Sequence, residues 1–290
     1  MIATETLDLT PAIPIFLRRL HADSTRAAYA REVARFLAWL EGNGPLDAEV
    51  LPRYVEVLRG RKLSPTFIAW RATVVAAFLR DAHRQGVLDR DLVTGYRLPR
   101  GTRGFAPRVL SAAELKRLLA APDARSWQGR RDLAVLVCLG VGGLRAGEVC
   151  RLRVGDVDLS TYRVTLRVTG KGDKRRLVSL AGRPASPLRA WARVRGDAAP
   201  DAPWLLARRA VDGTPPRGLN VAAVDYITRR TARVAGMAGV HAHALRHSAA
   251  SLALTRGVRL HEVRDQLGHA SIVTTSRYLH VTVMASRFSQ

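Results

Sequence analysis

The sequence predicts a mainly helical protein with a small antiparallel β-sheet, an α+β arrangement divided between two domains. Apolar residues recur at spacings of three and four over most of the 290 residues, which is typical of helices. Residues 162–180 instead alternate apolar and polar side chains about a glycine-rich turn, which indicates a hairpin. Residues 98–107 are rich in proline, glycine and arginine and indicate a linker, so we expect domains at 1–103 and 104–290.

The first domain is expected to be entirely helical. One helix begins at Ser24 and is ended by glycines at positions 42 and 44; its apolar stripe comprises Tyr29, Val33, Phe36, Leu37 and Leu40. A second helix begins where Ser64 precedes Pro65, because serine caps a helix N-terminus and proline suits the first turn. That helix is expected to run to Gln85, and Gly86 closes it.

The second domain is expected to place helices around the hairpin. Ser111 and Glu114 have the spacing of a capping box, and the almost wholly apolar segment 132–140 predicts a central helix. Strands are expected over 162–169 and 175–180, with 153–157 as a third strand. Further helices are expected from Ser186 onward and over 220–235, 243–256, 260–267 and 271–283.

The chain is strongly basic. Lys and Arg total 47 against 24 Asp and Glu, a net charge of +23, and the isoelectric point is near 11.5. This imbalance predicts a polyanionic partner, most commonly nucleic acid. Only four of the basic residues are lysines; genome base composition would explain that preference but not the excess over acids. An anionic membrane usually attracts a basic amphipathic helix or tail, whereas here the charge is spread along the chain.

The sequence favours a cytoplasmic protein without a membrane segment. Its longest uncharged apolar run, 133–144, falls well short of the roughly 20 residues of a membrane span. The first ten residues lack the basic-then-apolar layout of a secretion signal. Cys138 and Cys150 lie in apolar helical patterns, as expected of core thiols in a reducing compartment.

Two arginines and a histidine have the chemistry to hold and act on a phosphate. Arginine forms bidentate, charge-assisted hydrogen bonds to phosphate oxygens, and Arg145 and Arg246 each stand in an unusual segment, 143–148 and 243–247. His243 precedes Arg246 by three residues, so both side chains lie on one face of a helix. These residue types suit charge stabilisation and proton transfer during phosphoryl transfer.

Two further segments offer an acid and a nucleophile. Lys171 lies at the hairpin tip and could protonate an alkoxide leaving group, with Lys174 in the same turn as a rival for that role. His269 precedes Tyr278 by nine residues, and Tyr278 offers a hydroxyl nucleophile. Because a free phenol has a pKa of about 10, this nucleophile needs a base and a cationic surround.

These segments, taken in order, resemble the tyrosine recombinase family, which includes the phage integrases and the Xer-type recombinases. The family pattern has an arginine in Gly-Leu-Arg-x-x-Glu, a hairpin lysine, a His-x-x-Arg, a histidine in Leu-Gly-His and a later tyrosine. This chain has all six positions within 105–280, with Ala242 where a proline often stands. The first domain resembles the family's core-binding domain through Ser24-Thr-x-x-x-Tyr29 and Phe36-x-x-Trp39.

The resemblance implies a site-specific DNA recombinase, with a helical, SAM-like core-binding domain at 1–103 and a catalytic domain at 104–290. Tyr278 would attack a scissile phosphate and form a 3′-phosphotyrosyl link with a free 5′-hydroxyl. The link stores the bond energy, so ligation requires no nucleotide cofactor, and the two arginines take the place of a metal. The other implied roles are as follows: Arg145 and Arg246 bind the non-bridging oxygens, Lys171 protonates the leaving 5′-oxygen, His243 acts as acid and base, and His269 hydrogen-bonds the phosphate.

The implied partner is double-stranded DNA, which the two domains clamp during integration, excision or resolution. Four protomers on two DNA sites would form the active tetramer. Whether a second recombinase or an accessory protein takes part stays open.

Other interpretations also stay open from the sequence. A type IB topoisomerase-like enzyme would use the same chemistry to relax supercoils, and a catalytically silent DNA-binding regulator would keep only the fold. Arg145 could simply pair with Glu148. The spacing of His241, His243 and His247 could suggest a metal, but no Cys, Asp or Glu stands at supporting spacing and the arginines would repel a cation.

Overall fold

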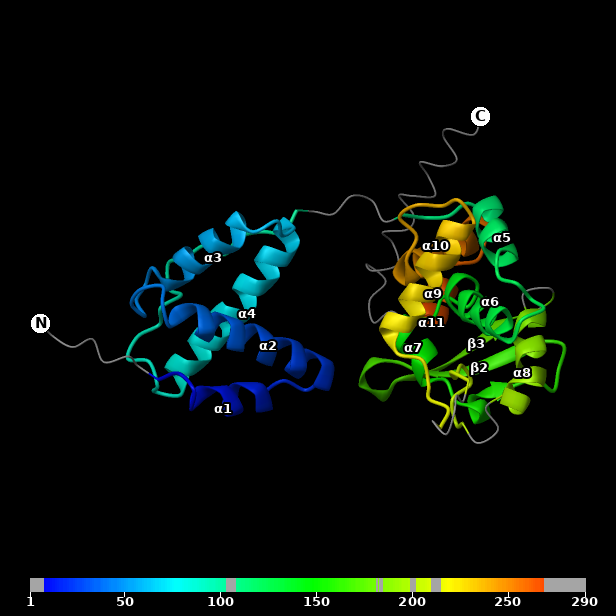
Figure 1. The fold of residues 1–290 in the computed structure, drawn as a ribbon, viewed down its shortest axis with the longest axis horizontal. Coiled ribbons are helices and arrows are strands. Elements are labelled where there is room, and N and C mark those ends of the chain that lie inside the picture. Colours follow the sequence, from blue (N-terminus) through cyan, green and yellow to red (C-terminus); the bar gives the residue numbers. More distant parts are fainter. Residues whose placement is uncertain are drawn as a thin grey trace, which may run out of the picture. The chain divides into compact units, whose positions relative to one another are not determined.

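The computed structural model describes residues 8–102, 108–180, 182, 185–198, 202–209 and 215–268 (Figure 1). The chain forms two compact units, Met1–Phe105 and Ala106–Gln290. Each unit has its own hydrophobic core, built only from residues of that unit. The mainly helical fold with one small antiparallel sheet confirms the predicted fold class.

The first unit is helical over its described residues. Its helices are α1 (Ala12–Arg18), α2 (Asp23–Leu40), α3 (Val50–Gly60) and α4 (Pro65–Arg84). The longest, α4, packs against the other three. It begins as predicted, because the Ser64 hydroxyl accepts a hydrogen bond from Phe67 N (3.3 Å) and Pro65 occupies the first turn.

A buried polar triad joins three helices of the first unit. The Glu32 carboxylate of α2 accepts hydrogen bonds from the Tyr54 hydroxyl of α3 (2.7 Å) and from Arg71 Nε of α4 (2.6 Å). Arg71 Nη2 also donates to the Tyr54 oxygen (2.7 Å). Burial and the adjacent Glu32 raise the pKa of Tyr54. A buried charge is tolerated only when it is paired and hydrogen-bonded, and this triad meets that condition.

The second unit contains the predicted hairpin. Strand β2 (Val164–Thr169) pairs antiparallel with β3 (Arg175–Leu180) in a register that opposes Val164 to Leu180 and Thr169 to Arg175. On the inner face of β2, Val164, Leu166 and Val168 are buried in the core. The alternation of side chains in the sequence therefore predicted both the strands and the buried face.

Two details of the predicted sheet are wrong. The third strand, β1, comprises only Val157–Asp158, and Val154–Asp156 forms a 3₁₀ turn because Asp156 Oδ2 accepts a hydrogen bond from Arg153 N (2.9 Å). Tyr162 is not part of β2; it is 71% exposed and lies in the turn between β1 and β2.

Seven helices of the second unit lie within its described residues: α5 (Ala112–Ala120), α6 (Trp127–Gly140), α7 (Ala146–Arg151), α8 (Ser186–Ala198), α9 (Val221–Val234), α10 (Ala242–Thr255) and α11 (Leu260–Leu267). Helix α6 is the predicted central helix and packs against α8 and α10. The predicted capping box forms at α5, where Ser111 and Glu114 exchange hydrogen bonds. The helix predicted over 271–283 lies outside the described residues.

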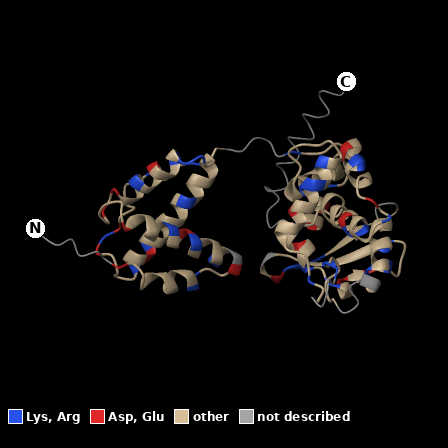
Figure 2. Ribbon diagram, viewed as in Figure 1, with Lys and Arg blue, Asp and Glu red and all other residues tan. Residues whose placement is uncertain are grey.

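Charge and hydropathy follow the sequence expectations in the parts that the structure describes. Figure 2 shows basic residues along the elements of both units rather than in one segment. Among the described helices, none combines the length and the apolar character that a membrane span requires. Cys138 and Cys150 are both free thiols, and burial raises the pKa of Cys138 to about 12.

Candidate active site

The first predicted arginine stands at the start of α7, directly after a tight turn. Gly143 has a φ of +68°, and a Cβ there would lie 2.6 Å from the Leu267 side chain, so only glycine fits. Arg145 follows the turn, and its Nη1 donates to Glu148 Oε1 (2.9 Å) while its backbone N donates to Glu148 Oε2 (2.8 Å). The suggested pairing with Glu148 is therefore present, yet the Arg145 side chain stays 40% exposed and accessible to a ligand.

The His-x-x-Arg segment forms the first turns of α10. His241 caps this helix, because its Nδ1 accepts a hydrogen bond from Ala244 N (3.1 Å). His243 packs edge-on against His247 with ring centroids 4.2 Å apart. Arg246 points into the unit, where its Nη1 donates to Gly143 O (2.6 Å) and its guanidinium lies 3.8 Å from Glu148.

Three guanidinium groups form hydrogen bonds to the C-terminal end of α11. Gly268 adopts a left-handed conformation (φ +66°) and ends the helix, which leaves the last carbonyls without helical partners. Three successive carbonyls each accept from a different arginine: Arg176 Nε to Gln266 O (2.7 Å), Arg246 Nη2 to Leu267 O (2.7 Å) and Arg145 Nη2 to Gly268 O (3.4 Å). The partial negative charge of a helix C-terminus favours cations at this position.

The structure thus brings Arg145, His243 and Arg246 to one region around Glu148 and the end of α11. Lys171 lies in the turn between β2 and β3, a 3₁₀ turn (Lys171–Asp173) that Lys174 follows. Gly170 N donates to Lys174 O (2.8 Å) and closes this turn. His269 and Tyr278 lie outside the described residues, which end one residue before His269.

Glu148 stays ionised at the centre of this cluster. Burial opposes its charge, but the hydrogen bonds from Arg176, the Arg145 backbone and the Arg145 side chain outweigh that effect and lower the pKa of Glu148. A carboxyl whose pKa is lower in the folded state than in the unfolded state stabilises the fold above its unfolded pKa. This contribution is lost as the pH falls from about 4.5 through the folded pKa.

His243 is held neutral by its surroundings. Burial, together with the neighbouring Arg246, His241 and Arg145, lowers the pKa of His243 below its ordinary value of 6.5. At neutral pH its imidazole can therefore accept a proton, as an acid–base group must. Since the folded state binds this proton less tightly than the unfolded state, the associated stability is present above pH 6.5 and lost as the pH falls through the folded pKa.

We expect a proton NMR titration of the DNA-free protein to place the midpoint of His243 below 6.5. The His243→Gln variant assigns the ring resonance by its disappearance. A midpoint at or above 6.5 would mean that burial and the nearby cations do not lower the pKa of His243, and it would contradict the neutral imidazole.

Sequence reasoning missed Arg176 as a member of this cluster. Its Nη1 and Nη2 donate to the two oxygens of Glu148 at 3.0 and 2.8 Å, in addition to the bond to Gln266 O. A signal was present in the strand alternation: Arg176 shares the face of β3 that carries buried Val178 and Leu180. An arginine on a core-facing strand position requires a buried acceptor.

No metal cluster accompanies these side chains in the part of the chain that the structure describes. There, no three His, Cys, Asp or Glu residues lie close enough together to hold an ion. The rings of His243 and His247 are in contact. The charged groups near His243 are cations: after burial, Arg246, His241 and Arg145 lower its pKa.

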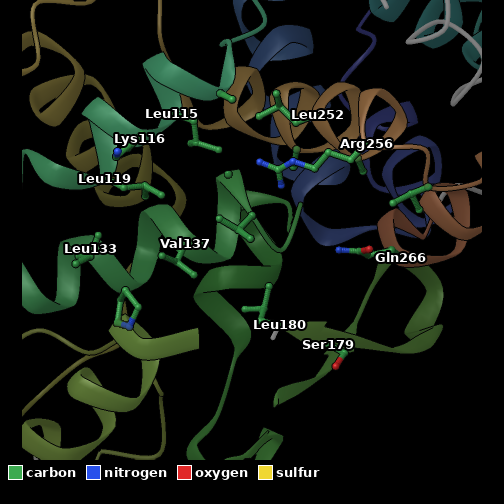
Figure 3. Close-up of a pocket in the computed structure, with 17 residues that line it drawn as sticks. Leu115, Lys116, Leu119, Leu133, Val137, Ser179, Leu180, Leu252, Arg256 and Gln266 are labelled. Carbon is green, nitrogen blue, oxygen red and sulfur yellow. The ribbon is translucent and has the colours of Figure 1, made fainter. Parts of the chain in front are cut away.

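A separate apolar pocket of about 720 Å³ lies in the second unit. Leucine and valine side chains of α5, α6 and α10 face it, with Lys116, Arg256 and Gln266 among the polar residues of its wall (Figure 3). None of the described residues that line it is one of the six predicted site residues. Its lining meets the arginine cluster at Gln266, whose carbonyl accepts from Arg176.

Comparison with known proteins agrees with this fold and site. Residues 108–284 match the phage integrase family. Tyrosine recombinase XerC of Mycobacterium sp. (strain JLS) is 32% identical over 285 residues, covering 93% of this chain and 92% of that protein. Tyrosine recombinase XerC of Mycobacterium leprae (strain TN) is 33% identical over 286 residues, covering 93% of each. The chain therefore belongs to the phage integrase family, the tyrosine recombinases, which confirms the family predicted from the motifs.

Solved structures share the fold at lower sequence identity. The XerH site-specific recombinase bound to palindromic difH substrate, a post-cleavage complex, has a TM-score of 0.70 and 22% identity, covering 91% of this chain and 78% of that one. A lambda integrase dimer bound to a COC′ core site has a TM-score of 0.69 and 16% identity, covering 93% and 75%.

Proposed function

We propose that this protein is a site-specific DNA recombinase that cleaves and rejoins DNA strands through a 3′-phosphotyrosyl intermediate. The observation that carries the proposal is the convergence of Arg145 and Arg246 on one carboxylate and one helix end. Two guanidinium groups fixed in this way, beside a neutral His243, match the charge stabilisation and proton transfer that phosphoryl transfer needs.

In this mechanism Tyr278 attacks the scissile phosphate, and the bond from phosphorus to the 5′-oxygen breaks as the bond to the tyrosine oxygen forms. Arg145 and Arg246 hold the non-bridging oxygens, whose negative charge they balance. His243 accepts the phenolic proton, and His269 hydrogen-bonds the phosphate. Lys171 donates a proton to the leaving 5′-oxygen, with Lys174 in the same turn as the alternative donor. A 5′-hydroxyl from a partner strand reverses these steps and rejoins the DNA.

We assign DNA contacts to both units. The proposed division is a core-binding domain over 1–103 and a catalytic domain over 104–290, and the basic residues of both units support contacts to phosphates (Figure 2). A lambda integrase tetramer bound to a Holliday junction, with a TM-score of 0.67, supports assembly of four protomers on two sites. We propose that the protein acts in the cytoplasm.

Covalent trapping tests this function. Nicked duplexes are built across inverted repeats that flank the gene, so that the short fragment carrying the new 5′-hydroxyl diffuses away and the phosphotyrosyl complex accumulates. We expect a slowly migrating protein–DNA band on a denaturing gel, attached at a 3′ end, both with and without excess EDTA. A band that requires a divalent cation would contradict the arginine-based mechanism. Tight, specific binding without any band would leave only DNA binding.

The positive charge predicts a steep salt dependence of DNA binding. If six to ten phosphates are contacted, affinity should fall by about 10³–10⁵-fold between 50 and 200 mM salt, because each contact releases condensed counterions. Fluorescence anisotropy with a labelled duplex measures the slope. An affinity that stays flat over this range would contradict a phosphate-dominated interface.

A further inference from the structure

Arg176 is the arginine of this cluster to which no role has been given. It lies on β3 close to the hairpin turn, and its side chain is only 11% exposed. Its backbone pairs with Val168 of β2. The whole guanidinium is used within the second unit, by Glu148 on one side and by Gln266 O on the other.

Arg176 shares both of its anchors with the two arginines proposed to hold the phosphate. Glu148 accepts from Arg145 at 2.9 Å and from Arg176 at 2.8 and 3.0 Å, and it lies 3.8 Å from Arg246. At the end of α11, the carbonyls at 266, 267 and 268 bind Arg176, Arg246 and Arg145 in turn. The three guanidinium groups therefore surround one carboxylate and are tied to three successive carbonyls of one helix end.

The side chain of Arg176 packs close to the backbone of two glycines, Gly268 and Gly170. A Cβ at Gly268 would lie 3.1 Å from Arg176 Cδ and Nη1, so the backbone that leads into His269 rests on this side chain. A Cβ at Gly170 would lie 3.5 Å from Glu148 Oε1 and 3.7 Å from Arg176 Nη1. The backbone just before Lys171 thus also passes close to the Arg176–Glu148 pair.

The pKa of Glu148 also indicates that Arg176 is its main partner. Among the interactions that lower the pKa of Glu148, the hydrogen bonds from Arg176 are the largest. Without Arg176, the buried carboxylate would keep the hydrogen bond from Arg145, whose side chain is 40% exposed and must also serve the substrate, and the more distant Arg246 at 3.8 Å.

We propose that Arg176 is a positioning residue for strand cleavage: it bridges Glu148 to the end of α11 and so holds Arg145, Arg246 and the backbone before Lys171 and His269 in their reactive arrangement. This inference rests on the proposed recombinase function. Arg176 itself touches no substrate. Its removal should therefore slow the chemical step and leave DNA affinity unchanged.

The second unit offers a matched control in Arg131. Its side chain is 13% exposed and donates through Nε and Nη2 to buried Asp132 at 3.0 and 2.8 Å. Asp132 also binds Arg230 of α9, and none of these described contacts involves a predicted site residue. Arg131→Ala also removes a buried arginine–carboxylate pair, and this pair shares no hydrogen bond with the Glu148 cluster.

The experiment compares the wild type, Arg176→Ala, Arg176→Lys and Arg131→Ala. Single-turnover cleavage of the nicked duplex at saturating DNA reports the chemical step, and anisotropy reports affinity. We expect Arg176→Ala to cleave about 10²-fold more slowly at unchanged affinity, because small displacements of positioned groups cost about that factor. Guanidinium chloride, at a concentration that leaves the fold intact, should restore part of the rate. Arg131→Ala should cleave like the wild type and gain nothing from guanidinium.

The Arg176→Lys variant tests whether slow cleavage results from a loss of the fold. Lysine keeps a positive charge at the site, but a single ammonium group cannot bridge both Glu148 oxygens and Gln266 O as the planar guanidinium does. We therefore expect this variant to fold and still to cleave slowly. Wild-type cleavage by either Arg176 variant would overturn the proposal, as would an equal loss in Arg131→Ala.

Hydrogen–deuterium exchange separates this inference from the proposed function. Loss of Arg176 should raise exchange in the last turn of α11 and the first turn of α7, whereas Arg131→Ala should leave both unchanged. If the wild type forms no covalent complex, the recombinase function fails, and the exchange result still decides whether Arg176 holds these elements. Unchanged exchange in Arg176→Ala would overturn the positioning role even where cleavage is slow.

Discussion

Replacing Tyr278 with phenylalanine should abolish the covalent protein–DNA complex and leave DNA binding intact. The change removes one oxygen atom, which is the nucleophile of the proposed reaction, and keeps the ring. The measurement is the denaturing gel with the nicked duplex, together with anisotropy for affinity. Tyr162→Phe is the control, because Tyr162 is 71% exposed in a turn and belongs to no predicted constellation; it should give the wild-type band.

A band of wild-type intensity from Tyr278→Phe would assign the nucleophile to another residue. Relaxation of unrelated plasmids by the wild type, without a partner site, would shift the function to a topoisomerase-like one. If neither the wild type nor Tyr278→Phe forms a covalent complex and both bind DNA alike, the protein is a DNA-binding regulator of this fold.

Arg145→Ala should slow cleavage by about 10²–10³-fold, the usual cost of losing one fixed donor to a developing anion. Its effect on the free energy of unfolding should be small. The Arg145 side chain is 40% exposed, and Glu148 keeps its bidentate partner Arg176 when Arg145 is lost. Single-turnover rates and thermal unfolding measure the two effects separately.

Arg151→Ala is the control for Arg145→Ala. Arg151 ends the same short helix, α7, and is exposed, with one long hydrogen bond to Thr169 O at 3.3 Å. Its loss should leave the cleavage rate unchanged. Equal slowing in both variants would mean that α7 contributes through general positive charge, and it would remove Arg145 from the reacting centre.

Local patterns in the sequence predicted much of this fold because they report on neighbouring residues. Three examples are the Ser64–Pro65 start of α4, the Ser111 capping box and the buried alternation of β2. Each of these patterns spans only a few residues of the sequence. The same reasoning extended the sheet too far. It could not weigh the Asp156 side chain against strand pairing, so it predicted a strand where Val154–Asp156 turns.

The contacts that build the site were beyond such patterns. Arg176 meets Glu148 across 28 positions and Gln266 across 90, and no local spacing encodes either meeting. The order of the motifs predicted that Arg145 and Arg246 share one site. It did not predict the acceptor groups that both arginines bind. His241 was considered only as a metal ligand, whereas its ring caps α10. Tertiary packing, which brings distant segments together, decided each of these points.

The three guanidinium groups on one helix end also govern how mutations combine. Because Arg145, Arg176 and Arg246 share Glu148 and successive carbonyls of α11, each one's free-energy contribution depends on the other two being present. Residues in one such network show coupling of about 0.5–3 kcal/mol rather than additivity. The effects of substitutions at Arg145, Arg176 and Arg246 on the free energy of unfolding should therefore not add, because each arginine partly compensates for the loss of another at Glu148.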